Sequence, residues 1–187
     1  FEAVINSDVS MICVGTPLGH DGNLDLRHVY SVINDICKAL KDKNSFHVIA
    51  IRSTVLPGTN ESIVKIIENE TGKKSGLDFG VISNPEFLRE GTAVQDYFNP
   101  PVTVLGTNCI KSYEIMKKVY SKVDETIIQV NVKEAEIIKY VNNSFHALKV
   151  SFANEIGNIS KSLDIDSHKL MDIFCRDKIL NISNYYF

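Results

Sequence analysis

The feature that most constrains the fold of this chain is a change of periodicity near residue 130. Before this point, short runs rich in β-branched residues alternate with segments of helical period, and after it the helical period continues for roughly thirty residues without a proline. Alternating strands and helices predict a mostly parallel sheet with helices on both faces. We therefore expect an α/β sheet domain in residues 1–130. A long connecting helix and the start of an all-α domain should follow in residues 131–187.

Five strands and five longer helices can be placed within this outline. The predicted strands are residues 9–14, 47–52, 78–83, 102–106 and 126–130. The first predicted helix follows Asp25, which would be its N-cap, in "LDLRHVYSVINDICKALKDK". The other predicted helices are residues 59 to about 70, 110–122, 132 to about 163, and 166–175.

Composition and charge argue against several classes of protein. A hydrophobic share of 44% and a charged share of 23% are those of an ordinary globular protein. A net charge of −3 without a dense basic tract argues against nucleic acid as a partner, and no apolar run reaches the ~20 residues of a membrane span. The four cysteines and five histidines show no metal-ligand spacing and no CxxC, so we expect no metal site and a cytoplasmic location.

Two loops that follow predicted strands are candidates for ligand binding, because ligands of open parallel sheets bind beyond the carboxyl ends of the strands. Gly15 lets the backbone approach a ligand, and Thr16 offers a hydroxyl. Ser53 and Thr54 end the second strand, although a hydroxyl pair there is also common structural capping. Taken alone, neither loop separates a ligand site from an ordinary turn.

The loop "SNPEFLREGTAVQD" after the third strand is the most informative. Pro85 favours an extended approach, and Glu86 follows it where a buried sheet meets a cleft. Glu86 and Glu90 are four residues apart and could share one helical face. A partly desolvated carboxylate at Glu86 would have a raised pKa and suit a general base. The alternative is a helix N-terminus stabilised by acidic residues.

The long predicted helix carries an unusual polar strip. At about 100° per residue, Lys139, Asn143, His146 and Asn154 fall within one strip roughly 80° wide, opposite a broad apolar side. A solvated lysine is the simplest explanation for Lys139 alone. Together with Asn143, however, Lys139 can bind a negative oxygen, as a point charge beside a directional amide donor.

Several motifs together resemble one family across almost the whole chain. They are "VGTP", "RSTVLPGT", "SNPEFLREGTAVQDY", "PPVTVLG" and "KYVNNSFHALKVSFANEIGNIS". The chain is identified by them as resembling the UDP-glucose/GDP-mannose dehydrogenase family. The resemblance implies a partial Rossmann-like, NAD-binding sheet domain in residues 1–130, followed by the start of a central helical domain for dimerisation and substrate binding in residues 131–187.

The resemblance also implies a reaction and a set of roles. The family oxidises the C6 alcohol of a nucleotide sugar to a carboxylate with two NAD, through a thiohemiacetal and a thioester on a cysteine. Thr16 and Thr54 match residues that contact NAD, Glu86 matches the residue that activates the hydrolytic water, and Lys139 with Asn143 matches the oxyanion pair. Residues that match positions holding the nucleotide sugar are Glu90, His146, Asn154, Tyr185 and Tyr186.

Two parts of the family pattern should lie outside the chain. The glycine-rich turn that cradles the NAD pyrophosphate is expected before Phe1, and the segment with the nucleophilic cysteine after Phe187. We therefore expect a fragment that is inactive alone. Within the resemblance, the doublet Pro100-Pro101, His146, "SFANEIGN" and the closing "ILNISNYY" are most similar to family members that act on GDP-mannose, so the resemblance implies GDP-mannose rather than UDP-glucose as the substrate.

Two other functions remain open at this point. One is a non-catalytic nucleotide-sugar-binding module that never had a nucleophile. The other is a shorter hydroxyacid dehydrogenase, which would not explain "NPEFLREG". A helix of about thirty residues would be ~45 Å long and too extended for a small domain to cover. Its apolar side is therefore expected to form a homodimer or a higher homo-oligomer.

Overall fold

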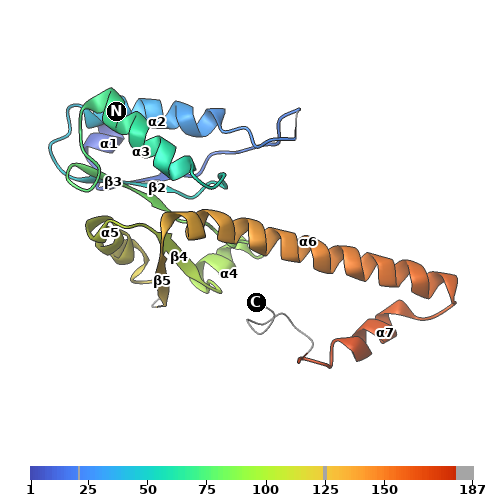
Figure 1. Cartoon of the computed structure of the whole chain (residues 1–187). Coiled ribbons are helices and arrows are strands. Elements are labelled where there is room, and N and C mark those ends of the chain that lie inside the picture. Colours follow the sequence, from blue (N-terminus) through green and yellow to red (C-terminus); the bar gives the residue numbers. More distant parts are fainter. Residues whose placement is uncertain (21, 124–125, 180–187) are drawn as a thin grey trace. The chain divides into compact units, whose positions relative to one another are not determined.

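The computed structural model describes residues 1–20, 22–123 and 126–179, and it divides into two compact units, Phe1–Val141 and Asn142–Phe187. The first unit contains a five-stranded sheet in the order β1-β2-β3-β4-β5 (Figure 1). The strands are β1 Val9–Ile12, β2 His47–Ile51, β3 Phe79–Ser83, β4 Thr103–Gly106 and β5 Ile127–Val130. The first three strands are parallel to one another, β4 and β5 are parallel, and β3 meets β4 in an antiparallel pairing. The predicted α/β fold with a mostly parallel sheet is confirmed.

Seven helices are described. They are α1 Glu2–Ile5, α2 Arg27–Leu40, α3 Thr59–Thr71, α4 Ala93–Phe98, α5 Ile110–Tyr120, α6 Val132–Ser162 and α7 Ser167–Phe174. The five longer predicted helices are present. The sequence did not predict α1 and α4, because elements of four and six residues are too short to show a helical period. The cap residue of α2 is Leu26 and not the predicted Asp25, but the Asp25 carboxylate accepts the N–H of Arg27, the first residue of α2, at 3.0 Å and also binds the side chain of Arg27.

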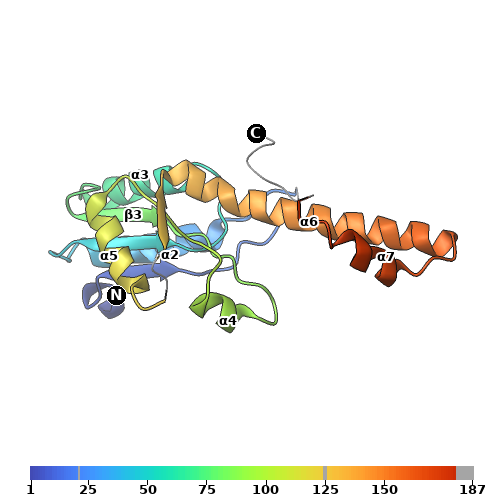
Figure 2. The ribbon, with the colours of Figure 1, turned by 90° about the horizontal axis from the view of Figure 1, so that it is seen from below.

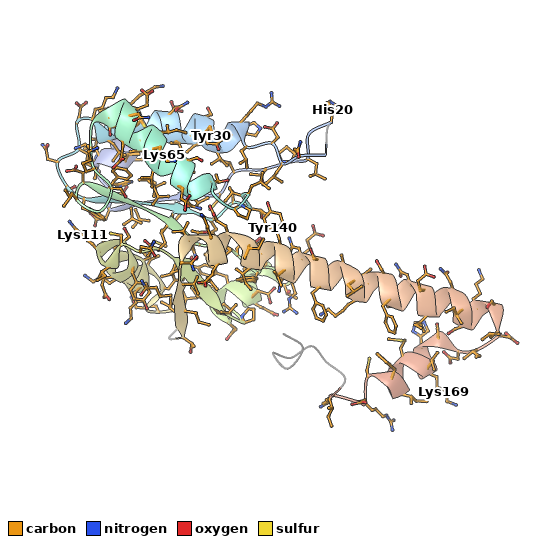
Figure 3. The ribbon with its side chains drawn as sticks, in the orientation of Figure 1. His20, Tyr30, Lys65, Lys111, Tyr140 and Lys169 are labelled. Atoms are coloured by element: carbon orange, nitrogen blue, oxygen red, sulfur yellow. The ribbon has the colours of Figure 1, made fainter. Side chains whose placement is uncertain are left out.

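Strand β2 separates two hydrophobic cores, because successive side chains of a strand point to opposite faces. Ile49 and Ile51 belong to the core under α2 and α3, whereas Val48 and Ala50 belong to the core under α5. Figure 1 shows α2 and α3 on one side of the sheet and α5 on the other, and Figure 2 looks onto the sheet from the side of α5. In Figure 3, Lys65 labels α3 and Lys111 labels α5 on these two sides. The sheet is thus covered on both faces, and its functional groups must emerge at an edge.

The second unit consists of the later part of α6 and of α7. Asp166 caps α7 by accepting hydrogen bonds from the N–H groups of His168 and Lys169, at 3.0 and 3.2 Å. The rings of Phe152 on α6 and Phe174 on α7 pack with their centroids 5.6 Å apart. Among the helices that the structure describes, none is long and apolar enough to span a membrane.

Candidate active site

The carboxyl ends of all five strands form one row. Pairing joins Ile12 to Ile51, Ile51 to Ser83, Ser83 to Gly106 and Gly106 to Val130, and each of these residues is the last of its strand. The last residues of the strands therefore lie side by side, although the chain leaves β4 and β5 in the direction opposite to that in which it leaves β1, β2 and β3, because β3 and β4 are antiparallel. Helix α6 begins two residues after β5, so its first turns emerge at the same row.

Glu86 and Lys139 form an ion pair at this row. The Nζ of Lys139 donates a hydrogen bond of 2.8 Å to Oε1 of Glu86, whose Oε2 accepts the N–H of Leu88 at 2.6 Å. The Lys139 side chain is only 11% exposed and that of Glu86 is 27% exposed. Partly buried charges are screened less by salt than surface charges. The structure thus brings together the carboxylate and the lysine that the sequence singled out on separate elements.

The expected raised pKa of Glu86 was wrong. Partial burial raises the pKa of Glu86, but hydrogen bonds from Lys139 and Leu88, together with the charges of Lys139 and Arg52, outweigh it. The pKa of Glu86 therefore lies below its ordinary value. Desolvation alone would give the raised pKa expected from the sequence, and the positive charge of Lys139 reverses it. While the pair is intact, Glu86 is ionised at neutral pH and is a weak base.

The expected helical face of Glu86 and Glu90 was also wrong. Residues 84–90 contain no helix, and α4 begins only at Ala93. Glu86 lies in the loop directly after β3 and is half-buried, whereas Glu90 is exposed. The two carboxylates are therefore not held on one helical surface.

Asp96 on α4 gives this loop its shape instead. The Asp96 carboxylate accepts hydrogen bonds from the N–H of Arg89 at 2.9 Å, from Nη2 of Arg89 at 2.6 Å and from the hydroxyl of Thr92 at 2.9 Å. Hydrogen bonds from the Arg89 side chain and backbone hold the pKa of Asp96 well below its usual value. The Asp96 carboxylate thus holds Arg89 and Thr92, which lie in the loop between Glu86 and α4, against the first turn of α4.

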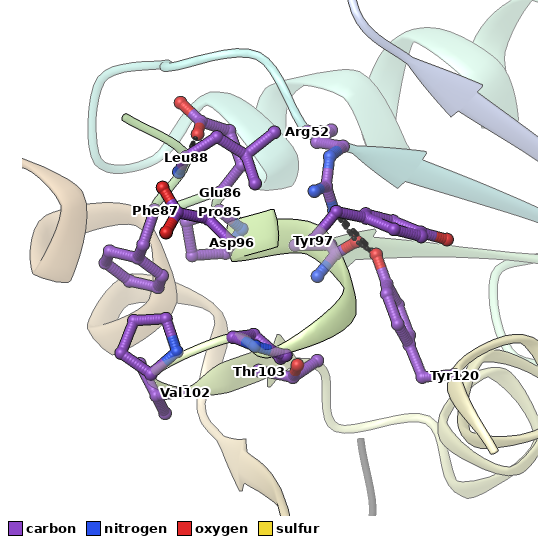
Figure 4. Close-up of a pocket in the computed structure, with 13 residues that line it drawn as sticks. Arg52, Pro85, Glu86, Phe87, Leu88, Asp96, Tyr97, Val102, Thr103 and Tyr120 are labelled. Carbon is purple, nitrogen blue, oxygen red and sulfur yellow. Dashed lines mark hydrogen bonds between the residues drawn. The ribbon is translucent and has the colours of Figure 1, made fainter. Parts of the chain in front are cut away.

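Arg52, Tyr120 and Asn84 form a second network beside Glu86 (Figure 4). Nη1 of Arg52 donates hydrogen bonds to the Tyr120 hydroxyl at 2.6 Å and to Oδ1 of Asn84 at 3.3 Å, and the Tyr120 hydroxyl also donates to Oδ1 of Asn84. The Asn84 amide donates to the carbonyl of Val104 at 3.1 Å. The network fixes the first residue after β3 and holds a cation near Glu86. Sequence reasoning missed it, because Arg52 and Tyr120 are 68 residues apart and Arg52, although it opens the motif "RSTVLPGT", was given no role.

Thr54 lies close to the helix that carries Lys139. Thr54 and Lys139, with Pro85 and Glu136, line one cavity of about 10 Å³, and roughly 10–15 Å³ is the space that a single water molecule needs. The neighbouring Ser53 hydroxyl donates to the carbonyl of Val14 at 2.7 Å, which is the structural role that the sequence left open for it. The loop that follows β2 therefore brings Thr54 to the same edge of the sheet as Lys139 and its partner Glu86.

Thr16 lies in a different and larger depression. A cavity of about 770 Å³ is lined by Gly15, Thr16, Pro17, Ser31 and others along α2, and ligand pockets span roughly 300–1,000 Å³. A side chain placed on Gly15 would meet nothing within 4 Å, so open space lies above this backbone. Apolar walls with two hydroxyls suit part of a dinucleotide, and the residues present fit that cofactor.

The remaining predicted residues lie outside the first unit. Asn143, His146 and Asn154 belong to the second unit, where all three side chains are exposed on α6. Tyr185 and Tyr186 lie outside the described residues.

No cysteine of the described residues lines either cavity at the row of strand ends, the one around Glu86 or the one around Thr54, although Cys13 directly follows the last residue of β1. Cys37 is buried on α2, and all four thiols are free. No group of three or more His, Cys, Asp or Glu side chains within the described part of the chain is arranged to hold a metal ion.

Comparison with known proteins matches this arrangement to one family. Residues 1–124 match the NAD binding domain of the UDP-glucose/GDP-mannose dehydrogenase family, and residues 133–187 match its central domain. GDP-mannose 6-dehydrogenase of Pseudomonas syringae pv. tomato is 50% identical over 186 residues, which are 99% of this chain and 42% of that protein. The chain thus spans less than half the length of the relatives that it matches.

Solved structures agree with this match. A crystal structure of a ternary complex of GDP-mannose dehydrogenase from Pseudomonas aeruginosa superimposes with a TM-score of 0.94 at 48% identity, over 99% of this chain and 43% of that one. A UDP-glucose dehydrogenase from Pyrobaculum islandicum gives a TM-score of 0.89 at 38% identity, over 96% of this chain and 41% of that one. With the sheet, the row of strand ends and the family match in agreement, the chain belongs to the UDP-glucose/GDP-mannose dehydrogenase family.

Proposed function

We propose that the full-length protein is an NAD-dependent nucleotide-sugar 6-dehydrogenase that oxidises GDP-mannose to GDP-mannuronate in two steps. The observation that carries this proposal is the pair of Glu86 and Lys139 at the row of strand ends, beside a water-sized cavity lined by Thr54. Relatives between 46% and 50% identical bear the name GDP-mannose 6-dehydrogenase, which supports this substrate. The activity is assigned to the full-length protein, because this chain spans 42% of the length of such relatives.

The overall reaction converts a CH₂OH group to a carboxylate. It uses two NAD⁺ and one water, and it releases two NADH and three protons. Bound NAD⁺ supplies the hydride acceptor for each oxidation step. Thr16 and Ser31, with the open backbone at Gly15, would hold part of the cofactor in the cavity along α2, and Thr54 would contact it from the second loop.

Lys139 is the cation that stabilises negative charge on the reacting oxygen. Its Nζ is held at the row of strand ends and bonds Glu86 while no substrate oxygen competes for it. Asn143, one helical turn later on α6, would donate its amide to the same oxygen. A preorganised donor of this kind contributes typically 10²–10³-fold to the rate of such a step.

Glu86 is the base that activates water for hydrolysis of the thioester. The pKa of Glu86 is low while Lys139 is bound to it. It rises when the lysine turns toward substrate oxygen, because burial raises this pKa and the charge of Lys139 no longer offsets that effect. The ion pair thus keeps the base ionised until the lysine is engaged. Thr54 would position the water in the small cavity that it lines with Lys139.

The nucleophilic cysteine is proposed to lie outside this chain, because no cysteine is among the described residues that line the two cavities. Residues for the nucleotide sugar would be Glu90, His146, Asn154, Tyr185 and Tyr186. They are proposed on their match to the family motifs alone.

UDP-glucose is the second candidate substrate. It is favoured by the structural likeness to the UDP-glucose dehydrogenase of Pyrobaculum islandicum, at a TM-score of 0.89. The choice depends on how the base of the nucleotide is bound.

The experiment that tests this function is NADH production by the full-length protein with GDP-mannose and UDP-glucose side by side. We expect two NADH per GDP-mannose consumed and little with UDP-glucose. Glu86→Gln should form two NADH per active site in a single turnover and then accumulate thioester, because hydrolysis follows both oxidations, and Lys139→Ala should suppress the first hydride transfer. Binding of GDP-mannose without NADH formation by the wild type would instead indicate a non-catalytic binding module.

We also propose that the protein is a homodimer, or a higher homo-oligomer, through the second unit. Several large apolar side chains of this unit are more than half exposed. They are Leu148, Ile159, Leu163 and Ile173 on or beside α6 and α7. Exposed apolar surface of this extent on two neighbouring helices is typical of a protein interface.

A further inference from the structure

Glu136 is a buried carboxylate that neither the motifs nor the reaction uses. It lies on α6, one turn before Lys139, and is 3% exposed. Its Oε2 accepts the N–H of Gly58 at 2.6 Å, and its Oε1 accepts the N–H of Asn60 at 2.8 Å and the amide of Asn60 at 2.6 Å. The hydrogen-bond donors to the Glu136 carboxylate are therefore uncharged N–H groups, and all of them lie at the start of α3.

These donors are the beginning of α3. Gly58 is the N-cap of α3, has a positive φ of 94° and supplies no side-chain cap. The first N–H groups of a helix lack intrahelical partners and carry the positive end of the helix dipole. Glu136 supplies the missing cap from a different helix. The loop that carries Thr54 runs from β2 to this capped end, so its far end is attached to α6.

A second contact holds the same turn of α6 against the sheet. A side chain on Gly106, at the end of β4, would place its Cβ 2.2 Å from the Cβ of Ala135. Only a glycine allows this approach. Ala135 and Glu136 therefore fix the first turn of α6 on two sides, against β4 and against α3. Lys139 follows one turn later and reaches Glu86 at 2.8 Å.

We propose that Glu136 is a positioning residue, whose cap on α3 sets the spacing between the Thr54 loop and Lys139. This inference rests on the proposed function and deepens it. Without the cap, the first turn of α6 keeps its contact with β4 and the exposed ion pair of Lys133 with Glu61, and the lysine loses its defined distance from Glu86 and from the reacting oxygen. Misplacement by about 1 Å can cost on the order of 10²-fold in rate.

Glu136→Gln in the full-length protein tests the proposal. A glutamine keeps the shape but turns a donor toward the N–H of Gly58 or of Asn60, so the cap is weakened without a cavity. We expect kcat to fall about 10- to 100-fold, while NAD binding changes little. We also expect the acidic limb of the pH–rate profile to move to higher pH, because Arg52 is then the main cation that opposes the burial of Glu86.

A second readout needs no turnover. Lys139 is 11% exposed and paired, so an amine-reactive reagent should label it slowly, as followed by mass spectrometry. Glu136→Gln should speed this labelling at least threefold. Asn60→Ala, which removes one of the three bonds and leaves the two backbone donors, should give a smaller change in the same direction and covers the case in which the first variant does not fold.

Glu134→Gln is the matched control. Glu134 lies in the same turn of α6, is exposed, and accepts only the N–H of Asn131 at the start of its own helix. It should leave labelling, kcat and the acidic limb as in the wild type. The proposal would be overturned if Lys139 were labelled at the wild-type rate in both Glu136→Gln and Asn60→Ala. It would also be overturned if Glu134→Gln changed this rate as much as Glu136→Gln does. A wild-type protein that oxidised no nucleotide sugar would sink the proposed function, while the labelling arm would still decide the role of Glu136.

Discussion

At the scale of single residues, the site depends on a carboxylate whose protonation is controlled by its partner. Glu86 is half-buried, which alone would favour the neutral acid, yet the ammonium of Lys139 at 2.8 Å reverses the direction. In the proposed reaction, the same lysine is the group that stabilises the reacting oxygen. A substrate that takes the lysine therefore changes the basicity of the carboxylate at the same moment.

Replacing Lys139 with methionine should show this coupling as a change of stability with pH. A carboxylate whose folded pKa is lowered contributes stability that is present above its ordinary pKa of 4.5 and is lost as the pH falls through the folded value. We expect Lys139→Met to cost on the order of 1 kcal/mol at pH 7, and progressively less below pH 4.5. The measurement is the difference in Tm from the wild type at several pH values.

Lys133→Met is the control for this prediction. Lys133 pairs with Glu61 at 3.3 Å on the surface, where the two side chains are 65% and 56% exposed. Its removal should change Tm little at any pH. A Tm difference for Lys139→Met that stays constant from pH 7 to pH 4 would contradict the coupling.

At the scale of elements, two glycines should respond in opposite directions to the same substitution. Gly106→Ala forces a Cβ to within 2.2 Å of Ala135, so it should push α6 from β4 and cost about 1–3 kcal/mol. Gly157→Ala lies inside α6 with nothing within 4 Å, so it should stabilise the helix by about 0.5–1 kcal/mol. Chemical denaturation of both variants measures the two changes in the free energy of unfolding. Equal changes would show that the close approach of Gly106 to Ala135 does not restrict the side chain at this position.

The cap of α7 offers a local test within the second unit. Asp166→Ala removes the acceptor for the N–H groups of His168 and Lys169, which should cost about 1 kcal/mol of helix stability. Amide hydrogen exchange in α7 should become roughly fivefold faster, since 1 kcal/mol corresponds to about that factor. Asp172→Ala, on an exposed position of the same helix, should leave the exchange unchanged. Unaltered exchange in Asp166→Ala would mean that packing alone holds α7.

At the scale of the whole molecule, the proposed oligomer can be separated from the fold of the chain. Leu148 is 63% exposed on α6, so a glutamate there costs little in the monomer and much in an apolar interface. We expect Leu148→Glu to convert the full-length protein to smaller species in sedimentation velocity. Lys161→Glu, on another side of the same helix, should keep the wild-type species. A wild type that sediments as a monomer would remove the proposal.

The sequence by itself determined the strands, the longer helices and the family, because periodicity and turn residues act over a few positions and are legible without neighbours. It also predicted Glu86, Thr54 and Lys139 to be members of one site. Only the tertiary structure decided how they are connected. Lys139 and Glu86 are 53 residues apart, and Glu136 and Gly58 are 78 apart. The pKa of Glu86 and the cap on α3 follow from these distant contacts. The pKa of a group depends on all charges and hydrogen-bond donors near it in space, whatever their positions in the chain. The direction of a pKa shift is therefore decided only by the folded structure.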